Sequence, residues 1–133
     1  MVLVSVLLLT RVGGKKDHGS TFAGSPLAAA AALHVLERVS VPEFLKAVEV
    51  AGQHMRSRLF NMEEAMNVRG RGLISGFDVT RPASDVVLDA RDKGLFIHSA
   101  GPHTIRLVPP LNITLDDMDD GLDILAEVLR KKD

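Results

Sequence analysis

The stretch that decides the fold is Val68-Arg69-Gly70-Arg71-Gly72-Leu73-Ile74-Ser75-Gly76-Phe77-Asp78-Val79. Its three glycines among β-branched and apolar residues predict a strand or a hairpin whose backbone bends or approaches another segment closely. Two more short strands are predicted at Leu95–His98 and Thr104–Val108. Helices are predicted before, between and after these strands, without strict βαβ alternation, so the sequence indicates an α+β domain.

The first two helices begin at prolines. Ser25-Pro26 opens one of them, because serine can cap free amide groups and proline suits the first helical position. The run Leu27 to Leu36 is apolar nearly all round, so we expect it to be buried on most sides. Pro42 starts a helix that we expect at a surface. Its apolar residues fall on one stripe: Leu45, Val48, Met55 and Leu59.

Two helices are predicted nearer the C-terminus. Ser84 is expected to cap a short helix that ends before Gly94, which suits a left-handed stop. Thr114, with Asp117 three residues later, forms a start similar to a capping box for the last helix. One face of that helix is apolar and consists of Met118, Leu122, Leu125 and Leu129.

The segment Val2–Leu9 is apolar on both alternating faces, the pattern of a strand covered on both sides in a parallel sheet. Nothing else in the chain offers such a sheet, so we interpret residues 1–17 as a remnant strand and linker of a larger domain. The segment is far shorter than the roughly 20 residues needed to cross a bilayer, and we do not expect a membrane span.

Composition excludes several classes of partner and site. The 16 Lys and Arg nearly balance 17 Asp and Glu, so neither nucleic acid nor an anionic membrane is expected as a partner. The absence of cysteine excludes disulfides, thiolate metal sites and a cysteine nucleophile. It fits a reducing compartment, and the cytoplasm is the expected location.

The densest candidate site is His18-Gly19-Ser20-Thr21-Phe22-Ala23-Gly24-Ser25-Pro26. Glycines and hydroxyl side chains lead here into a helix N-terminus, whose free N–H groups and dipole favour an anion. A hydroxyl from Ser20 or Thr21 would add a further donor, and a phosphate would fit. A plain turn and cap is the alternative, and the residues alone leave both open.

Arg106 is the second candidate, in the apolar segment Thr104-Ile105-Arg106-Leu107-Val108-Pro109-Pro110. A guanidinium in such surroundings needs a carboxylate partner, which in a cleft would be a substrate or a gating acid. An edge-strand arginine that reaches water is the alternative.

Two other patterns are not interpreted as sites. Gly70 to Gly76 differs from the dinucleotide fingerprint, because its third glycine comes one residue late and no strand–turn–helix context follows. The histidines form no HExxH pair, and His98 and His103, which flank one turn, lack a third ligand. No metal site is therefore expected.

From His18 onward the chain resembles the C-terminal part of class III pyridoxal-phosphate aminotransferases, above all the acetylornithine and ornithine types. Four segments in the right order carry the resemblance: His18–Ala28, Val68–Leu73, Ala90–Leu95 and Ile105–Leu111. The resemblance implies the C-terminal small domain of a fold-type I enzyme, spanning residues 18–133. This domain would contain the interdomain helix and a small, mainly antiparallel sheet with helices.

The resemblance also implies a function. Such enzymes are homodimers that use pyridoxal 5'-phosphate to transfer an amino group from N-acetylornithine, or a similar ω-amino substrate, to 2-oxoglutarate in arginine metabolism. The threonine matching Thr21 reaches the cofactor phosphate bound in the opposite subunit, and Ser20 lines the same place. The arginine matching Arg106 lies by the substrate entrance, where it can pair with a glutamate of the large domain.

The lysine that such enzymes need is not matched. In the family it precedes a strand resembling Val2–Leu9, whereas Lys15 and Lys16 follow that strand here. We therefore expect no catalytic residue in this chain, poor cofactor binding and no transamination without the missing large domain. Two alternatives stay open: a non-enzymatic dimerising or regulatory fragment, and the small domain of another class III enzyme such as an ornithine or succinylornithine aminotransferase or an aminomutase.

Overall fold

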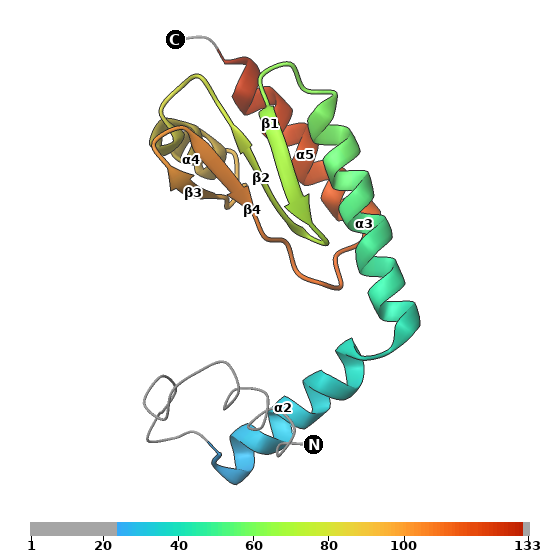
Figure 1. Cartoon of the computed structure of the whole chain (residues 1–133). Helices are drawn as coiled ribbons and strands as arrows, with labels where there is room; N and C mark the ends of the chain where they lie inside the picture. Colours follow the sequence, from blue (N-terminus) through green and yellow to red (C-terminus); the bar gives the residue numbers. More distant parts are fainter. Residues whose placement is uncertain (1–23, 132–133) are drawn as a thin grey trace. The chain divides into compact units, whose positions relative to one another are not determined.

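The computed structural model describes residues 24–131 (Figure 1). The chain divides into two units, Met1–Ser40 and Val41–Asp133. The strand predicted at Val2–Leu9 and the candidate residues Ser20 and Thr21 lie outside the described residues. The domain boundary at residues 17 and 18 therefore stays a prediction.

Helix α2, Pro26–Val39, begins as predicted. The Ser25 hydroxyl accepts a hydrogen bond from the Ala28 amide at 3.3 Å, and Pro26 occupies the first turn. The expected burial is wrong for this chain, because α2 has no buried residue and Leu27 is 83% exposed. Five consecutive alanines, Ala28 to Ala32, favour this helix, because alanine has the highest helix propensity. No helix within residues 24–131 has the length and apolar character that crossing a bilayer requires.

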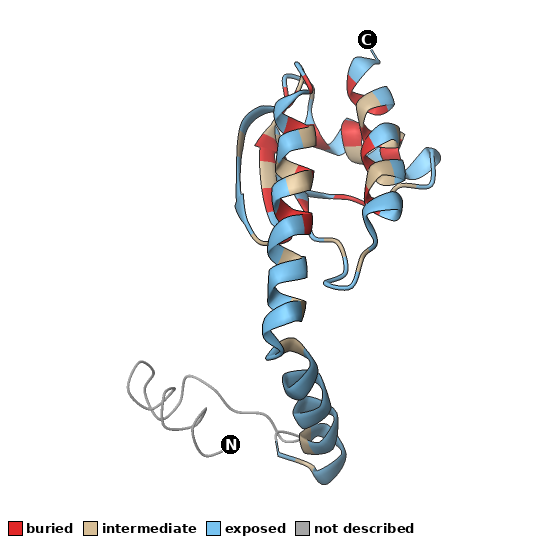
Figure 2. Ribbon diagram, turned by 90° about the vertical axis from the view of Figure 1, so that its right-hand side faces the viewer, coloured by how far each residue is buried: buried red, intermediate tan, exposed pale blue. Residues whose placement is uncertain are grey.

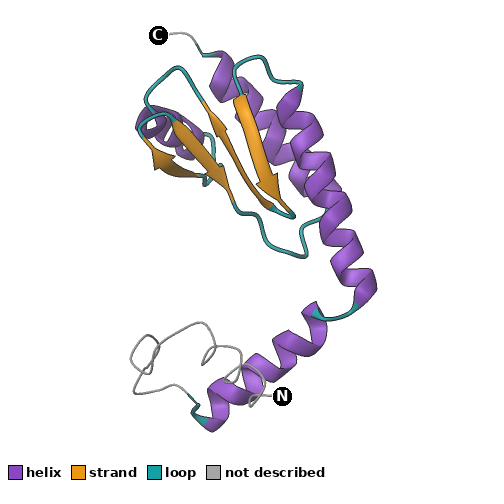
Figure 3. Cartoon of the chain, in the orientation of Figure 1, coloured by secondary structure: helices purple, strands orange, loops and turns teal. Residues whose placement is uncertain are grey.

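The second unit contains a four-stranded sheet in the order β1-β2-β4-β3 (Figure 3). Its strands are β1 (Met66–Arg71), β2 (Ile74–Asp78), β3 (His98–Gly101) and β4 (Thr104–Leu107), and every neighbouring pair is antiparallel. The deciding stretch thus forms the β1–β2 hairpin, as one of its two interpretations predicted. The predicted α+β class with a small antiparallel sheet is confirmed.

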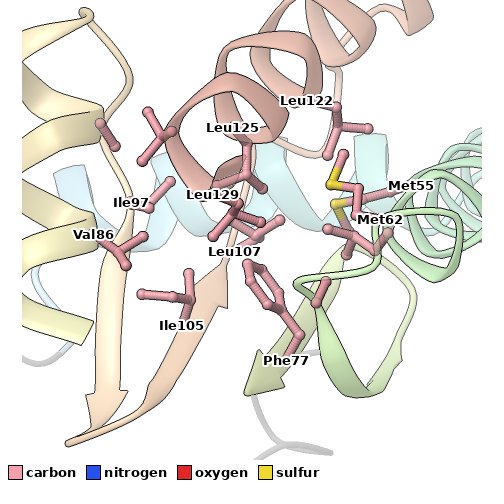
Figure 4. Close-up of a cluster of buried hydrophobic side chains, with 14 of the residues drawn as sticks. Met55, Met62, Phe77, Val86, Ile97, Ile105, Leu107, Leu122, Leu125 and Leu129 are labelled. Atoms are coloured by element: carbon pink, nitrogen blue, oxygen red, sulfur yellow. The ribbon is translucent and has the colours of Figure 1, made fainter. Parts of the chain in front are cut away.

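Within the unit Val41–Asp133, three helices cover one face of this sheet and no described element of the unit covers the other, which we call the open face (Figure 1). Helix α3 (Pro42–Phe60) packs on β1 and β2, α4 (Ala83–Asp92) packs on β3 and β4, and α5 (Leu115–Arg130) contacts both helices. Figure 4 shows the side chains that fill the space between the two layers. The most deeply buried large ones are Phe77, Met55, Leu59, Ile105, Leu125, Val86 and Val128.

The predicted helix faces are largely confirmed. All four apolar residues predicted for the last helix are buried, and the Thr114 hydroxyl accepts a hydrogen bond from the Asp117 amide at 3.1 Å. On α3 the stripe is right except for Leu45, because Val48 is partly buried and packs against the core. Met55 and Leu59 are buried, whereas Leu45 is exposed and no residue before Ala51 is buried (Figure 2).

Two predicted boundaries are wrong. Ser84 is not a cap: Pro82 precedes the first turn of α4, and the Ser84 hydroxyl donates to the neighbouring Asp85 carboxylate. Residues 95–97 are not a strand, because the left-handed Gly94 ends α4 as predicted and Leu95 donates back to the Ala90 carbonyl at 2.8 Å. These residues connect α4 to the sheet, and β3 begins only at His98.

The tip of the β1–β2 hairpin lies directly against α3. A Cβ atom added at Gly52 would lie 2.1 Å from the Gly72 carbonyl oxygen, so only glycine fits there. The Arg56 guanidinium donates to that same oxygen at 2.7 Å. The close backbone approach predicted from the glycines is therefore real, and its partner is α3.

Candidate functional site

The open face of the sheet carries one transverse row of polar positions. Arg69 on β1 lies opposite Gly76 on β2, Gly76 lies opposite Arg106 on β4, and Arg106 lies opposite His98 on β3. Directly opposed residues of an antiparallel pair have Cβ atoms about 4.5–5.5 Å apart. Two arginines and a histidine therefore project from one row, with a glycine between the arginines.

Arg106 lies on an inner strand. The alternative of an edge-strand arginine that reaches water is wrong in the position of the strand, because β4 is paired on both sides, with β2 and with β3, and right in that Arg106 is exposed. Ile105 and Leu107 point into the core while Arg106 is exposed, as alternation along a strand requires. None of the hydrogen bonds or ion pairs between residues 24 and 131 involves its guanidinium, so within this part of the chain the cation is open to a ligand.

Arg69 differs from Arg106 because a carboxylate already occupies it. The Arg69 guanidinium donates to Asp78 at 2.9 Å, and Asp78 also accepts from Thr104 at 2.8 Å and from Asn67 at 3.1 Å. Hydrogen bonds from Arg69 first, then from Thr104 and Asn67, lower the pKa of Asp78 from 3.8 to about 2. The two arginines of the row are thus chemically distinct.

A cavity of about 280 Å³ adjoins the Arg106 end of this row. Arg106, His98 and Asp117 contribute its charged or titratable lining, and the other walls are mostly apolar. The apolar lining comes from Met55, Leu95, Phe96, Ile97, Leu107, Val108, Pro109, Pro110, Ile113, Met118, Leu122 and Leu125. Such a cavity suits a ligand with an anionic group and an aliphatic part.

Asp119, in the first half of α5, serves a structural contact. Asp119 accepts from His54 at 2.7 Å and from Arg58, which joins α5 to α3. The hydrogen bond from His54 is the main cause that lowers the pKa of Asp119.

Within residues 24–131 no three His, Asp or Glu side chains are grouped closely enough to hold a metal ion. His98 and His103 are used separately, since His103 bonds the Arg81 carbonyl at 3.0 Å.

The structure describes the candidate anion-binding segment, His18 to Pro26, only from Gly24 onward. Gly24 adopts a positive φ of 84° and Ser25 caps α2, so these two residues serve the turn and the cap. Ser20 and Thr21 lie outside the described residues, and their role stays a prediction.

The sequence profile of the family Aminotransferase class-III matches residues 5–129. The chain belongs to this family. Class III aminotransferases are pyridoxal-phosphate-dependent transferases. The match runs through the whole of the described sheet unit except its last two described residues, and it includes Arg106 and His98.

Several relatives are acetylornithine aminotransferases. That of Caldanaerobacter subterraneus subsp. tengcongensis is 41% identical over 118 residues, which are 85% of this chain and 30% of that protein. The mitochondrial one of Eremothecium gossypii is 37% identical over 117 residues, 85% of this chain and 28% of that protein. The chain therefore spans about three tenths of the length of these class III aminotransferases.

Solved structures agree with this assignment. The N-acetylornithine aminotransferase from Stenotrophomonas maltophilia K279a has a TM-score of 0.75 and 31% identity, over 79% of this chain and 31% of that one. Ornithine aminotransferase PY00104 from Plasmodium yoelii has a TM-score of 0.71 and 26% identity, over 91% of this chain and 34% of that one. The described class III segment thus has the fold of part of a larger enzyme.

The described residues do not form a complete pyridoxal phosphate site. A Schiff-base lysine must be sheltered so that its amine can lose its proton. Lys46, Lys93 and Lys131 are all exposed, and the last two form ion pairs with Glu127 and Asp89, each at 2.7 Å. None of these three lysines fits that role.

Two residues of the row were not singled out as site residues from the sequence. Gly76 was interpreted only as a strand glycine and His98 only as a turn or surface histidine. Their importance depends on strand register, which places both beside Arg106. Spacing along the sequence does not give this register, because Gly76 and His98 lie on different strands that pair with β4 from opposite sides.

Proposed function

We propose that this chain is the C-terminal domain of an acetylornithine-type aminotransferase, which transfers an amino group from N-acetylornithine or a similar ω-amino substrate to 2-oxoglutarate. The observation that carries the proposal is the similarity to acetylornithine aminotransferases over 85% of the chain. The open Arg106 guanidinium supports it, because both proposed substrates carry carboxylates.

The proposal assigns roles to three side chains. Arg106 binds a substrate carboxylate at the entrance of the site. Ser20 and Thr21 bind the phosphate of pyridoxal 5'-phosphate held mainly by the opposite subunit of a homodimer. The remaining part of the cofactor site, including the lysine, belongs to a large domain that this chain does not match. Cytoplasmic location and a place in arginine metabolism are parts of the same proposal.

A chimera tests the function. Residues 18–133 replace the matching C-terminal segment of the Caldanaerobacter enzyme, and formation of glutamate from N-acetylornithine and 2-oxoglutarate is measured. We expect an active chimera. A chimera that is folded and loaded with cofactor but transaminates neither N-acetylornithine nor ornithine would overturn the proposal.

Arg106 is tested in the same chimera against a matched arginine. Arg106→Gln removes charge-assisted hydrogen bonds worth about 1.5–3 kcal/mol, so kcat/KM should fall roughly 10- to 100-fold. Arg69→Gln is the control on the same row, and because Asp78 already engages Arg69, we expect less than about a threefold change. Equal losses in the two variants would contradict the assignment.

Ser20 and Thr21 are tested through cofactor affinity. Ser20→Ala with Thr21→Val removes two hydroxyl donors to the phosphate, and the affinity for pyridoxal phosphate should fall at least about tenfold. Absorbance titration of the chimera measures this. Ser40→Ala is the control, because the Ser40 hydroxyl donates to the Leu36 carbonyl at 2.6 Å and so caps the other end of α2. Unchanged affinity in the double variant would refute the phosphate role.

A non-enzymatic dimerising fragment is the second candidate, and the exposed apolar residues of α2 favour it. Pyridoxal phosphate added to the 133-residue chain should give no internal-aldimine absorbance under the first proposal. Light scattering should report a dimer under both. A dimeric chain whose chimera is inactive would favour the second candidate.

A further inference from the structure

We propose that His98 and Arg106 together bind one carboxylate of the substrate, with Gly76 leaving the room that this carboxylate needs. This inference rests on the proposed function for the identity of the ligand. It adds a specificity-determining residue, His98, that none of the motifs in the sequence indicates.

The first step is the pairing of the two side chains. His98 and Arg106 are opposed residues of the antiparallel β3–β4 pair, and both are exposed on the same face. Their side chains therefore start from neighbouring Cβ atoms and can reach one ligand together. Both residues also line the same cavity. An imidazole N–H donates in either protonation state, so it complements a guanidinium that donates to the second carboxylate oxygen.

The second step is that the other donors on this face are occupied. Asp78 takes the guanidinium of Arg69 and the hydroxyl of Thr104. Within residues 24–131, no hydrogen bond or ion pair engages the side chain of Arg106 or of His98. Both side chains are exposed, so a ligand carboxylate can reach two neighbouring donors that no other described side chain engages. The row is thus neutral at its Arg69 side and anion-accepting at its Arg106 side.

The third step is the space beside Arg106. Gly76 is the residue opposite Arg106 on β2, and a Cβ atom added there would meet only the Ile105 carbonyl oxygen, at 3.5 Å. Its backbone does not require glycine, since its φ lies outside the left-handed region. A side chain would be tolerated by the backbone but would fill the place next to the guanidinium. The glycine therefore keeps the ligand position open.

The fourth step is the chemical class of the ligand. The cavity that His98 and Arg106 help to line is otherwise bounded mostly by apolar residues, among them Ile97, Leu107 and Pro109. Asp117 is its acidic lining residue, and one of its carboxylate oxygens accepts from the Thr114 hydroxyl at 2.6 Å. A carboxylate on a short aliphatic chain fits this arrangement better than a phosphate, which would need more donors than two side chains provide.

The test uses NMR titration of the 133-residue chain with 2-oxoglutarate, and with its dimethyl ester as the uncharged control. Saturable shifts of the His98 imidazole and the Arg106 Nε–H signals are expected with the acid alone. His98→Ala should raise the Kd at least about fivefold, and His98→Gln, which keeps an N–H donor, should restore most of the affinity. Gly76→Val should weaken binding as much as His98→Ala, and Arg69→Gln should change Kd less than about twofold.

Three results would overturn the inference. These are an unchanged Kd in His98→Ala, equal losses in His98→Ala and His98→Gln, and equal shifts with the ester. In the chimera, His98→Ala should raise the KM for a carboxylate substrate and leave kcat within about twofold. Titrations that behave as expected beside an inactive chimera would refute the proposed function and support the carboxylate pair. An active chimera with an unchanged KM in His98→Ala would do the opposite.

Discussion

Helices α2 and α5 are similar in length, at 14 and 16 residues, yet only α5 has a buried face. Both begin at a hydroxyl that accepts a hydrogen bond from the helix. The apolar residues of α5 lie on one stripe and pack against the rest of the same unit, whereas those of α2 surround the helix and none is buried. The apolar stripe of α5 thus predicts burial against other elements of the same unit. An apolar helix without a polar side, such as α2, predicts burial but does not indicate which segment or partner buries it.

The largest expected effect tests this difference directly. Leu125 is 1% exposed, so Leu125→Ala should lower the free energy of unfolding by about 2–5 kcal/mol through lost burial and a cavity. Leu27→Ala on α2 removes the same atoms from an exposed position and should change the free energy of unfolding by less than about 0.5 kcal/mol. Urea unfolding followed by circular dichroism measures both. A loss above about 2 kcal/mol in Leu27→Ala would mean that α2 is covered in solution.

The same comparison explains what the sequence could predict. The starts at Ser25, Pro42 and Thr114 and the β1–β2 hairpin follow from local chemistry, and each is found where the sequence predicts it. Residues 95–97 were misassigned because Leu95 and Ile97 are apolar for the sake of the core and the cavity, and not for a strand. A local sequence pattern does not distinguish apolar residues that belong to a strand from apolar residues of a connection that fills the core.

The candidate site shows the same division between local and non-local information. The sequence indicates Arg106 as a candidate, because a guanidinium in an apolar segment needs a partner. Its neighbours His98 and Gly76 were missed because only register across three strands brings them together. The pairing of Arg69 with Asp78, nine residues apart, likewise depends on the hairpin having formed.

The second-largest effect concerns two helical glycines. Gly52→Ala would place a Cβ atom 2.1 Å from the Gly72 carbonyl oxygen and should destabilise the sheet unit by roughly 1–3 kcal/mol, because backbone must move. Gly121→Ala on α5 meets only the Leu95 side chain at 3.6 Å. Its gain in helix propensity should leave stability equal or raised by up to about 1 kcal/mol. If both substitutions were tolerated in thermal unfolding, the hairpin tip would not hold α3.

The cap hydroxyls of Ser25 on α2 and Thr114 on α5 provide a third test of the difference between these helices. Thr114→Ala should cost about 1 kcal/mol in urea unfolding, because α5 unfolds together with the core. Ser25→Ala should cause fraying of α2, seen as faster amide hydrogen exchange at residues 28–30, with no shift of the main unfolding midpoint. An equal midpoint shift in both variants would show that α2 and the sheet unit unfold as one.

The smallest effect depends on pH and separates the two arginines of the open face. Folding lowers the pKa of Asp78 to about 2 from an ordinary value of 3.8. The folded chain therefore binds fewer protons at this group, so its contribution to stability is complete above about pH 4 and disappears as the pH falls through about 2. Asp78→Asn should flatten part of the fall in Tm between pH 4 and 2. Asp92→Asn, at an exposed acid without an ion pair among residues 24–131, should leave the profile unchanged. Parallel Tm profiles for the unsubstituted chain and Asp78→Asn would mean that Arg69 is not engaged, and Arg69 would then compete with Arg106 for the same carboxylate.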